Sequence, residues 1–71
     1  MILVSQNGYT SIVIQGVKAE KTETGYIIKA LDISGRGHIM AKDLTEQRVN
    51  DVLDEIYSHW QNGTRMYTIH K

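Results

Sequence analysis

The side chains best suited to bind a metal or to act as a general base are the three histidines, because cysteine is absent. A zinc site needs three or four converging ligands, usually with a close pair along the chain, whereas His38, His59 and His70 fall on different expected elements. His59 lies one helical turn after Glu55, a spacing that predicts a surface contact near a helix end. We therefore expect no catalytic residue, no metal site and no cofactor.

Clustered acids, serines and a short glycine motif are the remaining candidates for catalysis. Asp51, Asp54 and Glu55 are expected to share an exposed helix face, where nothing would separate their pKa values as acid–base catalysis requires. The serines have no nucleophile-elbow context, and residues 35–37 are too short for a phosphate-binding loop. These patterns indicate a solvated acidic face and a tight turn, and we expect the protein not to be an enzyme.

The aromatic side chains indicate two kinds of binding surface. Tyr57 and Trp60 fall on the last turns of the expected helix, where partial exposure would make them an anchor for a partner protein or a second copy. Tyrosines on an open sheet face beside basic side chains would instead stack on single-stranded nucleic acid. Both sets also have a structural reading, as core caps and half-buried strand residues. The residues of the nucleic-acid reading are Tyr9, Tyr26, Lys29, Arg36 and Tyr67.

The composition favours one small domain without a strong electrostatic field. A chain of 71 residues has room for a single core, so we expect one domain over residues 1–71 and marginal stability. Eight basic residues balance eight acidic ones, which disfavours nucleic acid and anionic membranes as partners. The opening apolar run is too short for a signal peptide or a membrane span, and it lacks a basic flank. Together with the absence of cysteine, this predicts a cytoplasmic protein.

A helix over residues 45–63 is the element around which the chain is organised. Thr45 is a suitable N-cap, with Asp43 as a rival, and Asn62-Gly63 predicts the C-terminal end. The apolar residues recur at helical spacing and form one stripe, which needs a sheet to pack against. They are Val49, Val52, Leu53, Ile56, Tyr57 and Trp60.

Short runs of strand-forming residues separated by turn residues predict a β-meander. The fold class we expect is α+β, an antiparallel β-meander packed against one amphipathic α-helix, with a short C-terminal strand. Asn7-Gly8 predicts a tight two-residue hairpin of type I′. The expected strands cover residues 2–6, 9–15, 17–22, 26–34, 38–43 and 65–70.

A meander of this kind leaves two edge strands that can pair with another chain. Residues 2–4 carry no proline, bulge or inward charge, the features that protect an edge. We therefore expect self-association through a strand edge, with Leu3 in the interface of a homodimer. The end of the helix at Tyr57 and Trp60 is the second candidate for this contact.

Two stretches of the chain resemble small uncharacterised proteins of Gram-positive bacteria and their phages or mobile elements. They are Ile2–Asn7 with the strands that follow, and Thr45–Val49 running into Val52–Ile56. The resemblance covers about residues 1–57, and residues 58–71 lie outside it. It implies a fold and a gene near phage or mobile-element genes, and it brings no activity and no functional residue.

The function that these patterns favour is that of a non-enzymatic protein–protein interaction module. Single-stranded nucleic-acid binding on the open sheet face is the alternative, and an enzyme ranks third. The sequence does not indicate which protein is the partner.

Overall fold

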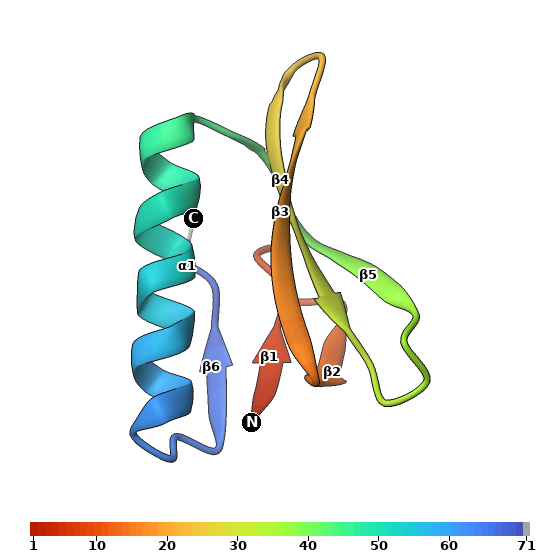
Figure 1. Ribbon diagram of the computed structural model, residues 1–71, viewed down its shortest axis with the longest axis vertical. Coiled ribbons are helices and arrows are strands. Elements are labelled where there is room, and N and C mark those ends of the chain that lie inside the picture. Colours follow the sequence, from red (N-terminus) through yellow and green to blue (C-terminus); the bar gives the residue numbers. More distant parts are fainter. Residues whose placement is uncertain (71) are drawn as a thin grey trace.

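The computed structural model describes residues 1–70 and has one helix and six strands in this range (Figure 1). These elements confirm the α+β fold class. In chain order they are β1 (Ile2–Val4), β2 (Ser11–Val13), β3 (Gly16–Thr22), β4 (Gly25–Leu31), β5 (Gly37–Leu44), α1 (Glu46–Gln61) and β6 (Met66–Thr68).

The strands form two three-stranded sheets, ordered β2-β1-β6 and β3-β4-β5. The second sheet is an antiparallel meander, whereas β1 pairs antiparallel with β2 and parallel with β6. Figure 1 shows α1 standing alongside both sheets, with β6 between the helix and β1. A parallel partner requires a long crossover, and α1 provides it. Within residues 1–70 there is no helix that is both long and apolar enough to cross a membrane.

Helix α1 begins where its capping residues predict. The hydroxyl of Thr45 accepts a hydrogen bond from the amide of Arg48 at 3.1 Å, which satisfies one donor of the first turn. The rival cap, Asp43, has a left-handed backbone with a φ of 56°, and its carboxylate accepts from the Thr24 hydroxyl at 2.9 Å. At the other end Gly63 has a φ of 78°, as the expected left-handed stop requires.

The core lies between the helix and the two sheets. From α1 the side chains of Val49, Val52 and Ile56 are buried, Leu53 and Trp60 are partly buried, and Tyr57 is half exposed. The strands, together with Ile14 after β2 and Ile69 after β6, supply the other buried apolar residues, which are Leu3, Ile28, Ala30, Met40, Ala41, Leu44 and Tyr67.

The first hairpin differs from the expected type I′ turn. Strands β1 and β2 do pair, but their connection spans residues 5–10, and Asn7 does not have the positive φ that the turn needs. Its side-chain oxygen instead accepts from the Ser5 hydroxyl at 2.7 Å and from the Tyr9 amide at 3.0 Å. The buried Ser5 hydroxyl in turn accepts from the Thr10 amide at 3.1 Å. The local side-chain bonds of Asn7 therefore decide the turn.

The expectation that Leu3 lies in a partner interface is wrong. Strand β1 has a neighbour on each side, because β6 returns next to it, so it is not an edge strand. The Leu3 side chain is 0% exposed and points into the core. A partner could reach it only after the domain opened.

Ile56 and Leu53 both belong to the apolar stripe of α1, but they differ in how deeply they are buried. We expect Ile56→Ala to lower the free energy of unfolding by about 2–5 kcal/mol, because Ile56 is fully buried and its truncation leaves a cavity. Leu53→Ala should cost clearly less, since Leu53 is only partly buried. Denaturant midpoints of the two variants test this. Equal losses would show that the core face of α1 is assigned wrongly.

Candidate protein-binding surface

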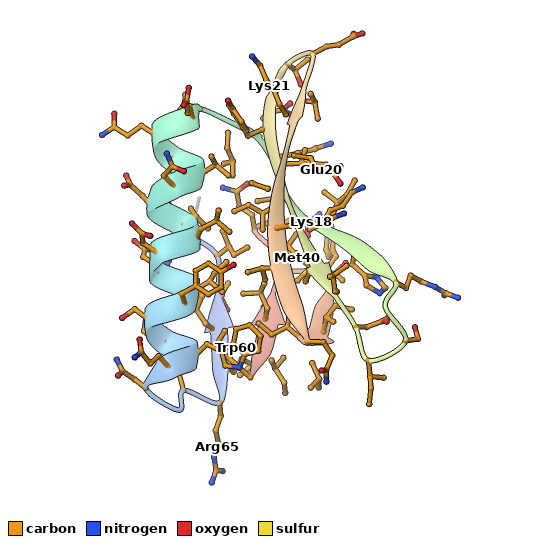
Figure 2. The ribbon with its side chains drawn as sticks, viewed as in Figure 1. Lys18, Glu20, Lys21, Met40, Trp60 and Arg65 are labelled. Carbon is orange, nitrogen blue, oxygen red and sulfur yellow. The ribbon has the colours of Figure 1, made fainter. Side chains whose placement is uncertain are left out.

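Two aromatic side chains of α1 meet the edge of the second sheet. Tyr57 is 48% exposed, and its hydroxyl donates to the backbone carbonyl of Val17 in β3 at 3.4 Å. Trp60 lies one turn later, packs partly on the core, and in Figure 2 sits between α1 and the strands. With Gln61 these two aromatics line an open hollow of about 300 Å³. The expected exposure of Tyr57 and Trp60 at the end of the helix thus becomes a concave apolar feature beside β3.

Strand β3 presents backbone groups that no other strand pairs on the side next to this hollow. Within residues 1–70 it pairs with β4 alone, so one of its sides is free. The backbone groups of successive residues in an antiparallel edge strand point alternately to the partner strand and to the free side. The Val17 carbonyl that accepts from Tyr57 points to the free side, and the same therefore holds for Ala19 and Lys21. The free side of β3 together with Tyr57, Trp60 and Gln61 is called the β3–α1 surface below.

The face of the second sheet that points away from α1 carries a small network of charges. Glu20 contacts Lys29 of the neighbouring strand and Lys18 of its own strand, each at an N–O distance of 3.1 Å. The hydrogen bond from Lys29, and then that from Lys18, hold the pKa of Glu20 below its ordinary value. Figure 2 shows Lys18 and Glu20 on the side of β3 that faces away from α1. Lys29 is thus an ion-pair partner of Glu20 in this network.

The residues of the predicted nucleic-acid platform are dispersed. Tyr9 is 90% exposed, but it lies in the β1–β2 connection, and Arg36 lies at the tip of the β4–β5 turn. Tyr26 packs against the core, and Tyr67 is buried. Since the tyrosines do not share an open sheet face with Lys29 and Arg36, they do not form a continuous stacking surface.

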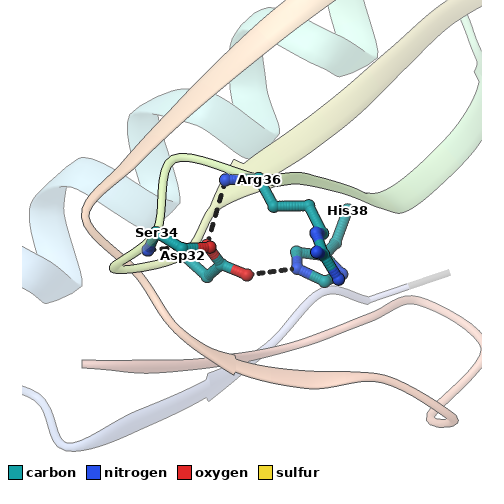
Figure 3. Close-up of polar contacts among 4 residues, drawn as sticks. All are labelled: Asp32, Ser34, Arg36 and His38. Carbon is teal, nitrogen blue, oxygen red and sulfur yellow. Dashed lines mark hydrogen bonds and ion pairs between the residues drawn. The ribbon is translucent and has the colours of Figure 1, made fainter.

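The β4–β5 turn holds a polar cluster that the sequence patterns above do not predict. Figure 3 shows the carboxylate of Asp32 accepting from the Arg36 amide at 3.0 Å and from the His38 ring nitrogen Nε2 at 2.8 Å. It also accepts from the Ser34 amide at 2.9 Å and from the Ser34 hydroxyl at 2.6 Å. The Ser34 hydroxyl, followed by His38, holds the pKa of Asp32 well below its ordinary range. The signal that could have found it is Asp followed two residues later by Ser, which is typical of a turn.

This cluster has the residue types of a hydrolase triad but the wrong connections. A nucleophilic serine must donate to the imidazole that removes its proton. Here the Ser34 hydroxyl donates to the Asp32 carboxylate, and His38 also donates to it. These hydrogen bonds stabilise the turn and do not activate the serine.

The last strand is fastened to the helix by Tyr67. Its hydroxyl donates to the Glu55 carboxylate, and its ring stacks on His59 at a centroid distance of 4.4 Å. Burial, followed by Glu55, raises the pKa of Tyr67 to about 12. The expected contact between Glu55 and His59 is therefore replaced, because Tyr67 takes the carboxylate and His59 bonds Thr64 at 3.2 Å. Across residues 1–70, no three histidine or acidic side chains gather in a way that could hold a metal ion.

The outer face of the β2-β1-β6 sheet carries a short apolar row. Ile2 pairs with Val13 on one side and with Met66 on the other, and all three side chains are exposed. Along β1 the row continues to the partly buried Val4, whose neighbours on the same face are the polar Ser11 and Thr68.

Comparisons of the chain with protein-family models, with curated proteins and with solved structures find no match.

The Asp32 cluster should make the turn sensitive to acid. The pKa of Asp32 in the folded protein lies below its ordinary value of 3.8, so the carboxylate stabilises the fold above that pH. As the pH falls below about 4 toward the folded pKa, this contribution is lost. We expect the difference in denaturant midpoint between wild type and Asp32→Asn to be largest near neutral pH and to shrink in acid.

The control for this experiment is Asp54→Asn, which makes the same charge change at an exposed position of α1. Its difference from wild type should stay small at each pH. An Asp32→Asn difference that is constant from neutral to acid pH would contradict the assigned role of the carboxylate.

Proposed function

We propose that the protein is a non-enzymatic protein–protein interaction module that takes up an extended segment of its partner on the β3–α1 surface. One observation carries the proposal: a free strand edge lies directly beside an open aromatic hollow. The hydrogen bond from the Tyr57 hydroxyl to the Val17 carbonyl joins the two features. The elements involved come from separate parts of the chain, β3 and the last turns of α1.

The two features supply what an added strand needs. Backbone amides and carbonyls of an edge strand give affinity for any extended segment, and an adjacent pocket selects a side chain. Val17, Ala19 and Lys21 present their backbone groups to the free side, and Ala19 is an exposed small residue that leaves room for a partner. The open hollow at Tyr57 and Trp60 offers aromatic surface that an apolar side chain of the added strand can contact.

Nucleic-acid binding is not favoured. The tyrosines expected to stack are dispersed, Lys29 is engaged by Glu20, and the chain has no basic excess. The cytoplasmic setting and the phage or mobile-element origin remain part of the proposal. The absence of cysteine and the resemblance of residues 1–57 support them.

A library of extended peptides tests the proposal whichever protein is the natural partner. Peptides selected on the wild-type protein should shift the amide NMR signals of Val17, Ala19 and Lys21 more than those of Lys18 and Glu20, whose amides face β4. Tyr57→Ala should weaken binding about tenfold or more by removing one wall of the hollow. The matched control is Tyr9→Ala, an equal truncation of an exposed tyrosine outside the surface, which should leave the affinity unchanged.

Two results would contradict the proposal. The first is a set of shifts centred away from β3 and the end of α1. The second is retention of single-stranded oligonucleotides at physiological salt that Arg36→Ala abolishes, which would favour the alternative function.

A further inference from the structure

We infer that the strand taken up by β3 is β3 of a second copy of this chain, paired antiparallel about Ala19. The inference rests on the proposed function because it uses the same free edge, and it names the partner. It moves the expected homodimer contact from β1, which is internal to its sheet, to β3, which is not.

The available backbone groups restrict how two copies of β3 can pair. The groups on the free side belong to Val17, Ala19 and Lys21, so the hydrogen-bonded pairs must join residues of this set. Antiparallel pairings that satisfy this condition differ by steps of two residues. Only the pairing that sets Ala19 opposite Ala19 of the second copy aligns all seven residues of the strand.

The charges of β3 select the same pairing. With Ala19 at the centre, Lys18 lies opposite Glu20 of the second copy, and Glu20 lies opposite its Lys18. A shift of two residues in one direction sets Lys18 opposite Lys18, and a shift in the other direction sets Glu20 opposite Glu20. Opposite charges directly across an antiparallel pair stabilise it, whereas like charges destabilise it. Charged edge strands are usually protected against pairing, but this edge is complementary to itself.

The side chains on the other face of the sheet are compatible with this pairing. The axis of such a pair is perpendicular to the sheet, so both copies of α1 lie on one face of a six-stranded sheet. Val17 then pairs with Lys21 of the second copy. Lys21 shares the face of Tyr26, which packs against the core, and Figure 2 shows it on the side of β3 toward α1. The aliphatic stem of Lys21 would cover the exposed part of Tyr57, which contacts Val17.

A charge exchange tests both the pairing and its register. Sedimentation equilibrium over a concentration series should give a mass for wild type that approaches twice the 8.1 kDa of the chain. Lys18→Glu alone and Glu20→Lys alone each set like charges opposite one another and should raise the dissociation constant about tenfold or more. An equimolar mixture of these two variants should associate again, because each supplies the charges that complement the other. The double variant, which carries both changes in one chain, should dimerise as wild type does.

Lys42→Glu is the matched control, because it makes the same charge change on an exposed residue of β5. It should leave the dimer unchanged, and circular dichroism should show that all variants remain folded. A wild-type protein that is monomeric at every concentration overturns the inference. So does a dimer that both single variants leave intact, or a mixture of the two that fails to associate.

Failure of this inference is distinguishable from failure of the proposed function. A monomeric wild type that still binds selected peptides through Val17, Ala19 and Lys21 would retain the β3–α1 surface and assign it to another protein. Ala19→Pro adds a backbone readout, since it removes an amide on the free side of β3 and none that bonds β4. It should abolish the dimer while the fold persists.

Discussion

Burial of one stripe of α1 is the interaction on which the rest of this structure depends. Neither sheet has a core of its own, because each is three strands wide and three of the six strands are three residues long. Val49, Val52 and Ile56 of α1 pack into one core with residues of both sheets and so join two marginal sheets into one packed unit. The same helix carries the chain back to β1, so that β6 can pair parallel, and it sets Tyr57 and Trp60 beside β3. Stability and the candidate surface therefore share one element.

Features that local sequence decides could be predicted, and features that depend on distant residues could not. The helix follows from the periodicity of its apolar residues, and the cap follows from the threonine at position 45, whose hydroxyl can accept from an amide of the first turn. Both features are found in the structure. The parallel pairing of β1 with β6 joins residues more than sixty positions apart, and no local sequence pattern indicates this pairing. The prediction of an exposed edge at Leu3 is wrong for this reason. The predicted type I′ turn at Asn7 is wrong for another reason. The Asn-Gly rule considers the backbone conformations that the two residues favour, and it does not include the hydrogen bonds that the Asn7 side chain forms.

Of the candidate site, the two aromatic residues of α1 could be predicted from local sequence, whereas the strand beside them could not. Helical spacing places Tyr57 and Trp60 at the rim of the core, and their exposure agrees with it. What they lie beside depends on the position of β3 in its sheet, and local sequence does not determine that position. For the tyrosines of the predicted nucleic-acid platform, the strand could be predicted but the buried face could not. Tyr26 and Tyr67 have the propensity of strand residues, but which face a strand buries is set by the layer packed on it, and here both rings face inward.

The charges on β3 explain how a free edge can be available to one partner without being open to all. An edge without charge would accept any extended chain, and an edge with charges of one sign would repel its own copy. Lys18 and Glu20 lie two residues apart on the same face, so they require an acidic and a basic residue at matching positions of the added strand. The hollow at Tyr57 and Trp60 adds an apolar requirement on the opposite face. A strand that meets both conditions carries alternating charges on one side and an apolar or aliphatic group on the other. Strand β3 has this pattern itself, with Lys18 and Glu20 on one face and the aliphatic stem of Lys21 on the other, and this is the physical reason for proposing a second copy of the chain as its partner.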